Sequence, residues 1–232
     1  VAGANAFPNQ ESLASRSSRG PTADRRMKPD ITTFFTATTS SSSGNPFDGS
    51  NTGATVTVAG TSFATPLAAG MAALVRQYFA TGWYPSGANV TANGFEPSAA
   101  LVKAVLLAGT RRMTNTSANI GNTYPNNGQG WGRIVLDDAL YLNPGTPDLR
   151  KLWVVDERQG LLTGESADYR IRVGTSTTPL RVVLVWSDYP GLPNAVPATV
   201  NNLNLLVTDP LSNTYKGNVF GTFTQAESIP NA

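Results

Sequence analysis

Residues 60–70 read GTSFATPLAAG, and this stretch decides how the first part of the chain folds. The residues before it, 55–58, read TVTV, an alternation of polar and apolar side chains that is typical of a β-strand. Gly60 breaks this alternation, and the residues that follow have the spacing of a helix. The sequence therefore predicts a strand, a glycine turn and a helix, with Ser62 where the helix begins.

This helix is predicted to be long, apolar and packed on most sides. Small residues such as Ala68 and Ala69 stand opposite a stripe of large apolar side chains. The stripe consists of Leu67, Met71, Leu74, Val75, Tyr78 and Phe79. A second helix is expected over about 97–108, because proline is favoured in a first turn and Gly109 can end the helix in a left-handed conformation.

A cluster of turn residues at 143–147, NPGTP, separates helix-like patterns from strand-like patterns. Strands and helices alternate before it, which indicates an α/β domain at 1–144. No helix pattern follows it, which indicates a partial all-β domain at 145–232, a β-sandwich or jelly roll.

Three segments carry the strand prediction after the boundary. Apolar residues alternate with arginine at 169–173, as on a strand with one wet face. Residues 181–186, RVVLVW, are typical of a buried strand, and apolar residues alternate again over 203–207. The sequence DPLSN at 209–213 predicts a turn before the next strand.

Composition excludes several kinds of protein. The hydrophobic content of 40% is enough for a sizeable core, so the chain is not disordered. The net charge of +2 comes from scattered lysines and arginines, which argues against a nucleic-acid footprint. No apolar run approaches the roughly 20 residues that cross a bilayer, so we expect no membrane span. The low charged fraction of 14%, with many small polar residues, is typical of an extracellular protein.

The chain has neither cysteine nor histidine. Disulfides and thiolate metal sites are therefore excluded. Histidine is the usual general base at neutral pH, so an acid–base reaction here needs a base from elsewhere. The chain opens on Val1, without an initiator methionine or a signal-peptide pattern, and we expect it to begin inside a longer protein.

Ser62 is the candidate for chemistry. A hydroxyl at the start of a helix lies beside free backbone N–H groups and the positive end of the helix dipole, which can stabilise an oxyanion. The alternative is structural, because serine before a helix is most often an N-cap. The segment is not the G-x-S-x-G nucleophile elbow, since Ala64 stands where the second glycine would be.

The whole stretch 60–70 closely resembles the serine motif of subtilisin-like serine proteases, with Phe63 for the usual Met and Leu67 for a frequent His. Upstream, SSRGPT at 17–22 and KPDI at 28–31 resemble elements that precede this motif in many bacterial subtilases. The downstream match is NGQGWGR at 127–133. These matches occur in the family's order, which makes the resemblance specific.

The tail extends the resemblance to nearly the whole chain. LVWSD at 184–188, VNNLNL at 200–205 and Asp209-Pro210 look like the appended C-terminal β-barrel of alkaline subtilases. The resemblance implies part of a subtilisin-like parallel-sheet domain followed by a truncated jelly-roll domain. It also implies a secreted, monomeric endopeptidase that acts on polypeptides, with Ser62 as the nucleophile and no cofactor needed for the chemistry.

Several family features are absent from this sequence. The family's catalytic Asp, its His and its oxyanion Asn have no counterpart here, and Val1–Ala4 resembles the strand that follows that Asn. After Asp30-Ile31 the family usually has Ala-Pro-Gly, but this chain reads TTFFT at 32–36. We therefore expect the chain alone to be inactive and its longer parent to be active.

Two further expectations accompany the resemblance. Subtilases often bind structural Ca²⁺ through oxygen ligands, and Asp188 is the candidate ligand here, although Asn202 and Asn204 stand where the family tends to have Asp. A turn residue is the alternative reading of Asp188. The alternative function is a non-catalytic relative, in which the β-rich tail docks or stabilises and the serine motif only caps a helix.

Overall fold

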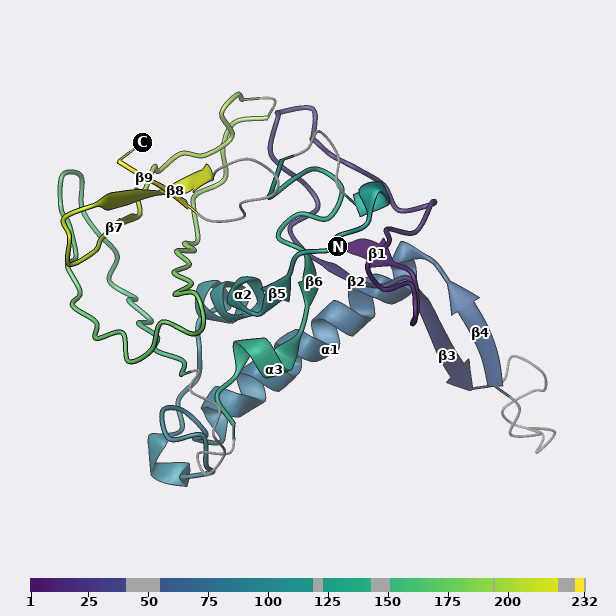
Figure 1. Ribbon diagram of the computed structural model, residues 1–232, viewed down its shortest axis with the longest axis horizontal. Helices are drawn as coiled ribbons and strands as arrows, with labels where there is room; N and C mark the ends of the chain where they lie inside the picture. Colours follow the sequence, from purple (N-terminus) through teal and green to yellow (C-terminus); the bar gives the residue numbers. More distant parts are fainter. Residues whose placement is uncertain (41–54, 119–122, 143–150, 194, 221–227, 232) are drawn as a thin grey trace. The chain divides into compact units, whose positions relative to one another are not determined.

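The computed structural model describes residues 1–40, 55–118, 123–142, 151–193, 195–220 and 228–231 (Figure 1). By their contacts the residues form two compact units. The first contains Val1–Gly70, Arg111–Ile134 and Asp188–Ala232, and the second contains Met71–Thr110 and Val135–Ser187. The predicted boundary at 143–147 lies outside the described residues.

One sheet has the strand order β1-β2-β6-β5, and its strands β1, β2 and β6 belong to the first unit. The strands are β1 (Ala2–Ala4), β2 (Thr32–Phe34), β6 (Arg133–Ile134) and β5 (Thr110–Arg111). β1 and β6 both pair with β2 in parallel, with Ala2 beside Thr32 and Thr32 beside Arg133. These parallel strand pairs, together with the helices, confirm the α/β class. One cluster of the buried core consists of Ala2, Ala4, Leu13, Met113 and Ala118.

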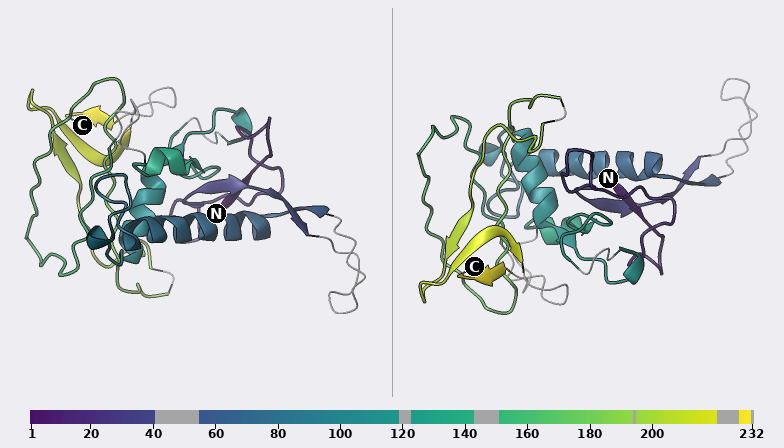
Figure 2. Two further views of the ribbon diagram at one scale, coloured as in Figure 1. Left: turned by 90° about the horizontal axis from the view of Figure 1, so that it is seen from below. Right: turned by 90° about the horizontal axis from the view of Figure 1, so that it is seen from above.

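A two-stranded antiparallel ribbon leads from this sheet to the first helix. β3 (Thr36–Ser40) pairs with β4 (Thr55–Ala59), with Thr36 opposite Ala59. Figure 2 shows the ribbon projecting away from β1 and β2. The predicted strand at 55–58 is confirmed, and its pairing brings the end of β4 back to the end of β2.

Helix α1 (Thr61–Ala80) begins where the sequence predicts. Its buried positions are Ala64, Ala68, Val75, Tyr78 and Phe79, and the Phe79 ring contacts those of Tyr84 and Phe95. The predicted stripe is wrong at Leu74, which is 51% exposed. The expected packing on most sides is not found either, since nine helix residues are exposed in the structure. Apolar spacing indicates which residues share a face but not what covers that face.

Helix α2 (Ala99–Ala108) confirms the second predicted helix, and α3 (Leu136–Ala139) follows β6. Short 3₁₀ turns lie at Thr91–Asn93 and Thr116–Ala118. Gly109 ends α2, but with a φ of −89° rather than in the predicted left-handed conformation. Glycine is required there by close packing, because a Cβ at Gly109 would lie 2.4 Å from the Cβ of Ala139.

The C-terminal region contains an antiparallel sheet of β7 (Leu206–Thr208), β8 (Thr214–Phe220) and β9 (Ser228–Pro230). The predicted turn at 209–213 is confirmed by the hydrogen bond from the Asp209 N–H to the Asn213 carbonyl, 3.0 Å. The predicted strands at 169–173 and 181–186 are wrong, since residues 151–187 contain no strand. Alternating side chains favour an extended backbone, but a strand also needs a paired neighbour.

Most apolar side chains of those two segments, Tyr169, Ile171, Val173, Val182 and Leu184, are exposed. The jelly-roll assignment for 145–232 therefore rests on β7, β8 and β9 alone. Among the described helices, none combines the length and the apolar character that crossing a membrane requires.

Candidate active site

The turn between β4 and α1 positions Ser62. Gly60 has a φ of 157°, which residues with a side chain rarely adopt, whereas a Cβ there would meet its nearest atoms at an ordinary 3.7 Å. The backbone conformation, rather than crowding, therefore requires glycine. The Gly60 carbonyl accepts the N–H groups of Phe63 and Ala64 at 3.0 and 3.3 Å, which starts the helix.

Ser62 is the second residue of α1 and is exposed. Within the described part of the chain its hydroxyl has no hydrogen-bond partner. Its backbone N–H lies in the first turn, where the N–H groups of a helix have no acceptor within the helix. The hydroxyl and a donor for an oxyanion thus belong to one exposed residue.

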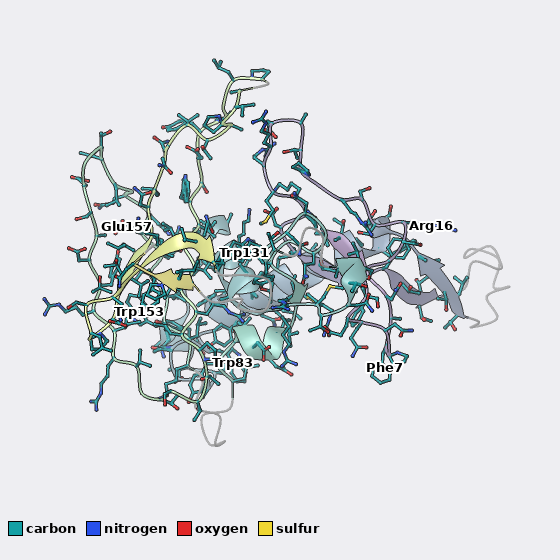
Figure 3. All side chains as sticks on the ribbon, turned by 45° about the horizontal axis from the view of Figure 1, so that its top comes forward. Phe7, Arg16, Trp83, Trp131, Trp153 and Glu157 are labelled. Atoms are coloured by element: carbon teal, nitrogen blue, oxygen red, sulfur yellow. The ribbon has the colours of Figure 1, made fainter. Side chains whose placement is uncertain are left out.

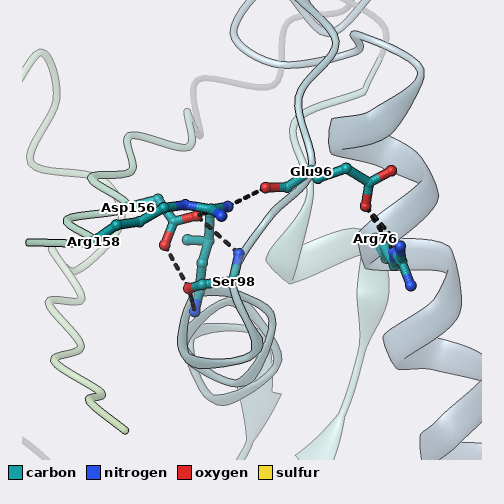
Figure 4. Close-up of polar contacts among 6 residues, drawn as sticks. Arg76, Glu96, Ser98, Asp156 and Arg158 are labelled. Carbon is teal, nitrogen blue, oxygen red and sulfur yellow. Dashed lines mark hydrogen bonds and ion pairs between the residues drawn. The ribbon is translucent and has the colours of Figure 1, made fainter.

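Ser98 shows what a capping serine looks like in this chain. It immediately precedes α2, and its Oγ accepts the Leu101 N–H at 3.0 Å. Its own N–H and hydroxyl donate to the Asp156 carboxylate, which Arg158 also contacts at 3.1 Å (Figure 4). Among the residues that the structure describes, Ser62 makes no capping bond of this kind, so the capping alternative fits Ser98 better than Ser62.

Three of the segments that carry the family resemblance meet beside β2. The Gly20 N–H donates to the Asn127 carbonyl, the Trp131 N–H to the Asp30 carbonyl and the Thr32 N–H to the Gly132 carbonyl, each at 2.9 Å. Segments that are about 100 residues apart in sequence are therefore tied together by backbone hydrogen bonds. The three motif segments thus form one packed region of the first unit.

The loop at 126–132 is closed by two amide side chains. Asn126 Oδ1 accepts the N–H groups of Gly128 and Gln129 at 2.8 and 3.1 Å. The Gln129 side chain is fully buried, its Oε1 accepts the Met113 N–H at 2.7 Å, and its Nε2 donates to the Met113 carbonyl at 3.1 Å. A buried amide is stable only when its polar atoms are bonded in this way.

Trp131, labelled in Figure 3, lies edge-on to the rings of Tyr124 and Phe220, with centroids 6.3 and 5.6 Å away. These three aromatic residues join the loop to β8 within the first unit. This environment is that of a packing residue.

Strand β1 and the start of α1 are linked through Phe35. The Gly60 N–H donates to the Phe35 carbonyl at 2.8 Å, and the Phe35 N–H donates to the Ala4 carbonyl at 2.7 Å. A Cβ at Gly3 would lie 2.4 Å from Phe35 Cδ2, so the ring packs directly on that glycine. The altered segment at 32–36 therefore connects the sheet with the turn before Ser62.

Asp188, the candidate Ca²⁺ ligand, is surrounded by N–H donors. Its carboxylate accepts the backbone N–H groups of Tyr189, Val200 and Asn201 and the Asn201 side-chain amide, at 2.8–3.2 Å. Desolvation raises the pKa of Asp188, but these hydrogen bonds together hold it below the ordinary 3.8. The described residues contain no group of three or more acidic, His or Cys side chains that could hold a metal. The Ca²⁺ site stays a prediction.

Sequence reasoning missed two residues of this region, Thr33 and Gln129. Both are polar and buried, and the hydroxyl of Thr33 donates to the Ala64 carbonyl at 2.6 Å. The available signal for Thr33 was the departure from the family pattern at 32–36. For Gln129 it was a polar residue between two glycines in the matched loop.

A model of the Subtilase family matches residues 1–132. The chain belongs to the Subtilase family. The match includes Ser62 and the motifs at 17–22, 28–31 and 60–70, and it ends within the loop of Gln129. The resemblance inferred from those motifs is thereby confirmed.

Three proteins of Dictyostelium discoideum, each named a serine protease/ABC transporter B family protein, are similar to this subtilase. The protein tagD is 33% identical over 242 residues, which cover 87% of this chain and 13% of that protein. The protein tagB is 30% identical over 244 residues, with 87% and 13% covered. The protein tagA is 32% identical over 225 residues, with 90% and 12% covered. The chain thus spans 12–13% of the length of these relatives.

Proposed function

We propose that this chain is part of a serine endopeptidase and that Ser62 is its acyl-forming nucleophile. The observation that supports this most is the state of Ser62, an exposed hydroxyl in the first turn of α1 without a hydrogen-bond partner among the described residues. Membership in the Subtilase family and the similarity to proteins named serine proteases point to the same chemistry. The base, its orienting Asp and the oxyanion Asn come from sequence outside this chain.

In the proposed reaction, the base takes the proton of the Ser62 hydroxyl while its oxygen attacks the carbonyl carbon of the peptide bond. The negative charge that develops on the carbonyl oxygen is stabilised by the Ser62 N–H at the positive end of α1. The C–N bond then breaks as the base protonates the leaving amine, and an ester remains on Ser62. Water then attacks the ester carbon while the base takes a proton from it. The bond to the Ser62 oxygen breaks as the base returns a proton to that oxygen, and the acid product leaves.

The proposal extends to the C-terminal region. Residues 145–232 form part of a β-sandwich of the jelly-roll type, and the antiparallel order β7-β8-β9 supports this. The protein acts on polypeptides, as a monomer, outside the cell. The support for the location is the low charged fraction of 14% and the abundance of small polar residues.

Kinetics with the full-length protein test the function. The substrate is a fluorogenic peptide blocked at both ends, which only an endopeptidase can cleave. Ser62→Ala should lower kcat by several orders of magnitude, because alanine has no hydroxyl that can attack the peptide carbonyl.

The matched control is Ser98→Ala, which removes a helix cap at a stability cost of about 1 kcal/mol and leaves kcat within about twofold. Full activity of the Ser62→Ala protein would contradict the assignment. A folded, inactive wild-type protein would favour the non-catalytic relative.

A further inference from the structure

Thr33 connects the altered segment 32–36 with the helix that carries Ser62. It lies in β2 and is only 1% exposed, and its hydroxyl donates to the Ala64 carbonyl at 2.6 Å. Ala64, in the first turn of α1, is itself fully buried. A hydrogen bond in such an environment is not exchanged for water, so its removal leaves a buried group less satisfied.

The side chain of the neighbouring residue Thr32 points to the opposite face of β2. Successive side chains of a strand point to opposite faces, and the Thr32 hydroxyl donates to the Gln129 carbonyl at 2.9 Å. Both threonines are buried and both hydroxyls bond a backbone carbonyl. Of these two hydroxyls, only that of Thr33 bonds to the helix of Ser62.

Helix geometry explains how a bond to Ala64 affects Ser62. Two residues apart on an α-helix correspond to a rotation of about 200°, so Ser62 and Ala64 lie on nearly opposite sides of α1. Ala64 is buried and Ser62 is exposed, as this rotation requires. Fixing the Ala64 peptide toward β2 therefore fixes the direction in which Ser62 points.

A second hydrogen bond from the same segment further restricts the position of the start of α1. The Gly60 N–H donates to the Phe35 carbonyl at 2.8 Å, immediately before α1. The helix start is thus held at two points, by Thr33 and Phe35. Thr33 and Phe35 both lie in the segment 32–36, which departs from the Ala-Pro-Gly that is usual in the family.

We propose that Thr33 is a positioning residue for Ser62, and that the altered segment 32–36 orients the nucleophile through the Thr33 hydroxyl. This inference rests on the proposed function of Ser62. Catalysis is sensitive to small displacements of a reacting atom, so loss of the hydroxyl should reduce turnover more than it reduces substrate binding.

The test compares three variants of the full-length protein. Thr33→Val removes the hydroxyl at nearly constant shape and should lower kcat about tenfold with KM nearly unchanged. Thr33→Ser keeps the hydroxyl and should restore kcat to within about threefold of wild type. Thr32→Val loses a comparable buried hydrogen bond, so it should lower the urea midpoint about as much as Thr33→Val and change kcat less than about twofold.

Equal kcat values for Thr33→Val and Thr32→Val would overturn the inference, because the effect would then be general destabilisation. If Ser62→Ala is inactive while Thr33→Val keeps the wild-type kcat, the inference fails and the proposed function stands. If Ser62→Ala stays active, both fail. If Thr33→Val does not fold, the comparison of Thr33→Ser with Thr33→Ala, which differ only by a hydroxyl, makes the same distinction.

Discussion

Three glycines of this subtilase differ in backbone conformation and in how closely other atoms surround them. Gly130 combines a φ of 62° with backbone crowding, because a Cβ would lie 2.2 Å from the Pro29 carbonyl oxygen. Gly160 has a φ of 74° but nothing within 4 Å, and Gly174 has open space without a positive φ. Comparing the three positions therefore separates the effect of a positive φ from the effect of crowding.

We expect Gly130→Ala to be the most harmful of the three alanine substitutions, at more than about 3 kcal/mol, because the crowding atoms are backbone. Gly160→Ala should cost about 1 kcal/mol, and Gly174→Ala should be neutral or slightly stabilising. Hydrogen exchange of the Trp131 and Thr32 amides reports on the loop. Equal protection in the Gly130 and Gly160 variants would contradict the crowding argument.

The carboxylate of Asp188 makes its loop sensitive to acid. Its pKa is lowered in the folded protein, so its ionised form stabilises the fold above the ordinary value of 3.8, and this stabilisation is lost as the pH falls below that value. The protection of the Val200 and Asn201 amides from hydrogen exchange, corrected for intrinsic exchange rates, should decrease as the pH is lowered below 3.8. In Asp188→Asn it should be low at every pH.

The same measurement tests the predicted Ca²⁺ site. If the N–H donors that bond the carboxylate hold the loop by themselves, chelation of Ca²⁺ by EDTA leaves the protection of the Val200 and Asn201 amides unchanged. A decrease in EDTA as large as that in Asp188→Asn would support the metal site. Protection that persists in wild type far below pH 3.8 would contradict the role of the carboxylate.

At the scale of elements, α2 and α3 pack through Gly109. A Cβ there would lie 2.4 Å from the Ala139 Cβ and 2.9 Å from its Cα. Gly109→Ala should therefore destabilise the second unit by about 2 kcal/mol, as overpacking commonly does. Ala139→Gly in the same protein should recover part of this loss, since one of the clashing atoms is gone. Additive effects in this double-mutant cycle would show that the two residues are not coupled.

The elements also show what the sequence could predict. The start of α1 and both ends of α2 agree with the prediction within about two residues, because Gly60 and Gly109 mark boundaries that local chemistry dictates, whereas the short helix α3 was not predicted. The strands at 169–173 and 181–186 were wrong, because pairing depends on distant residues that a local pattern does not contain. Ser62 was predicted from its motif, whereas Thr33 was missed because a hydroxyl's partner is set by tertiary structure.

At the scale of the whole molecule, the chain lacks the histidine that a neutral-pH serine protease uses as its base. We expect the 232-residue chain, purified free of host proteases, not to hydrolyse peptides, and the full-length protein to do so. The assay compares both at equal molar concentration with the doubly blocked peptide. Equal turnover by the isolated chain would show that the base lies within these residues.

The most direct measurement of the central claim is labelling of the full-length protein with a fluorophosphonate, which reacts with activated serines, followed by peptide mapping. We expect one adduct on Ser62, its loss in Ser62→Ala, and unchanged labelling in Ser98→Ala. Absence of an adduct on Ser62 in a folded, fully processed protein, or an adduct on a different serine, would contradict it.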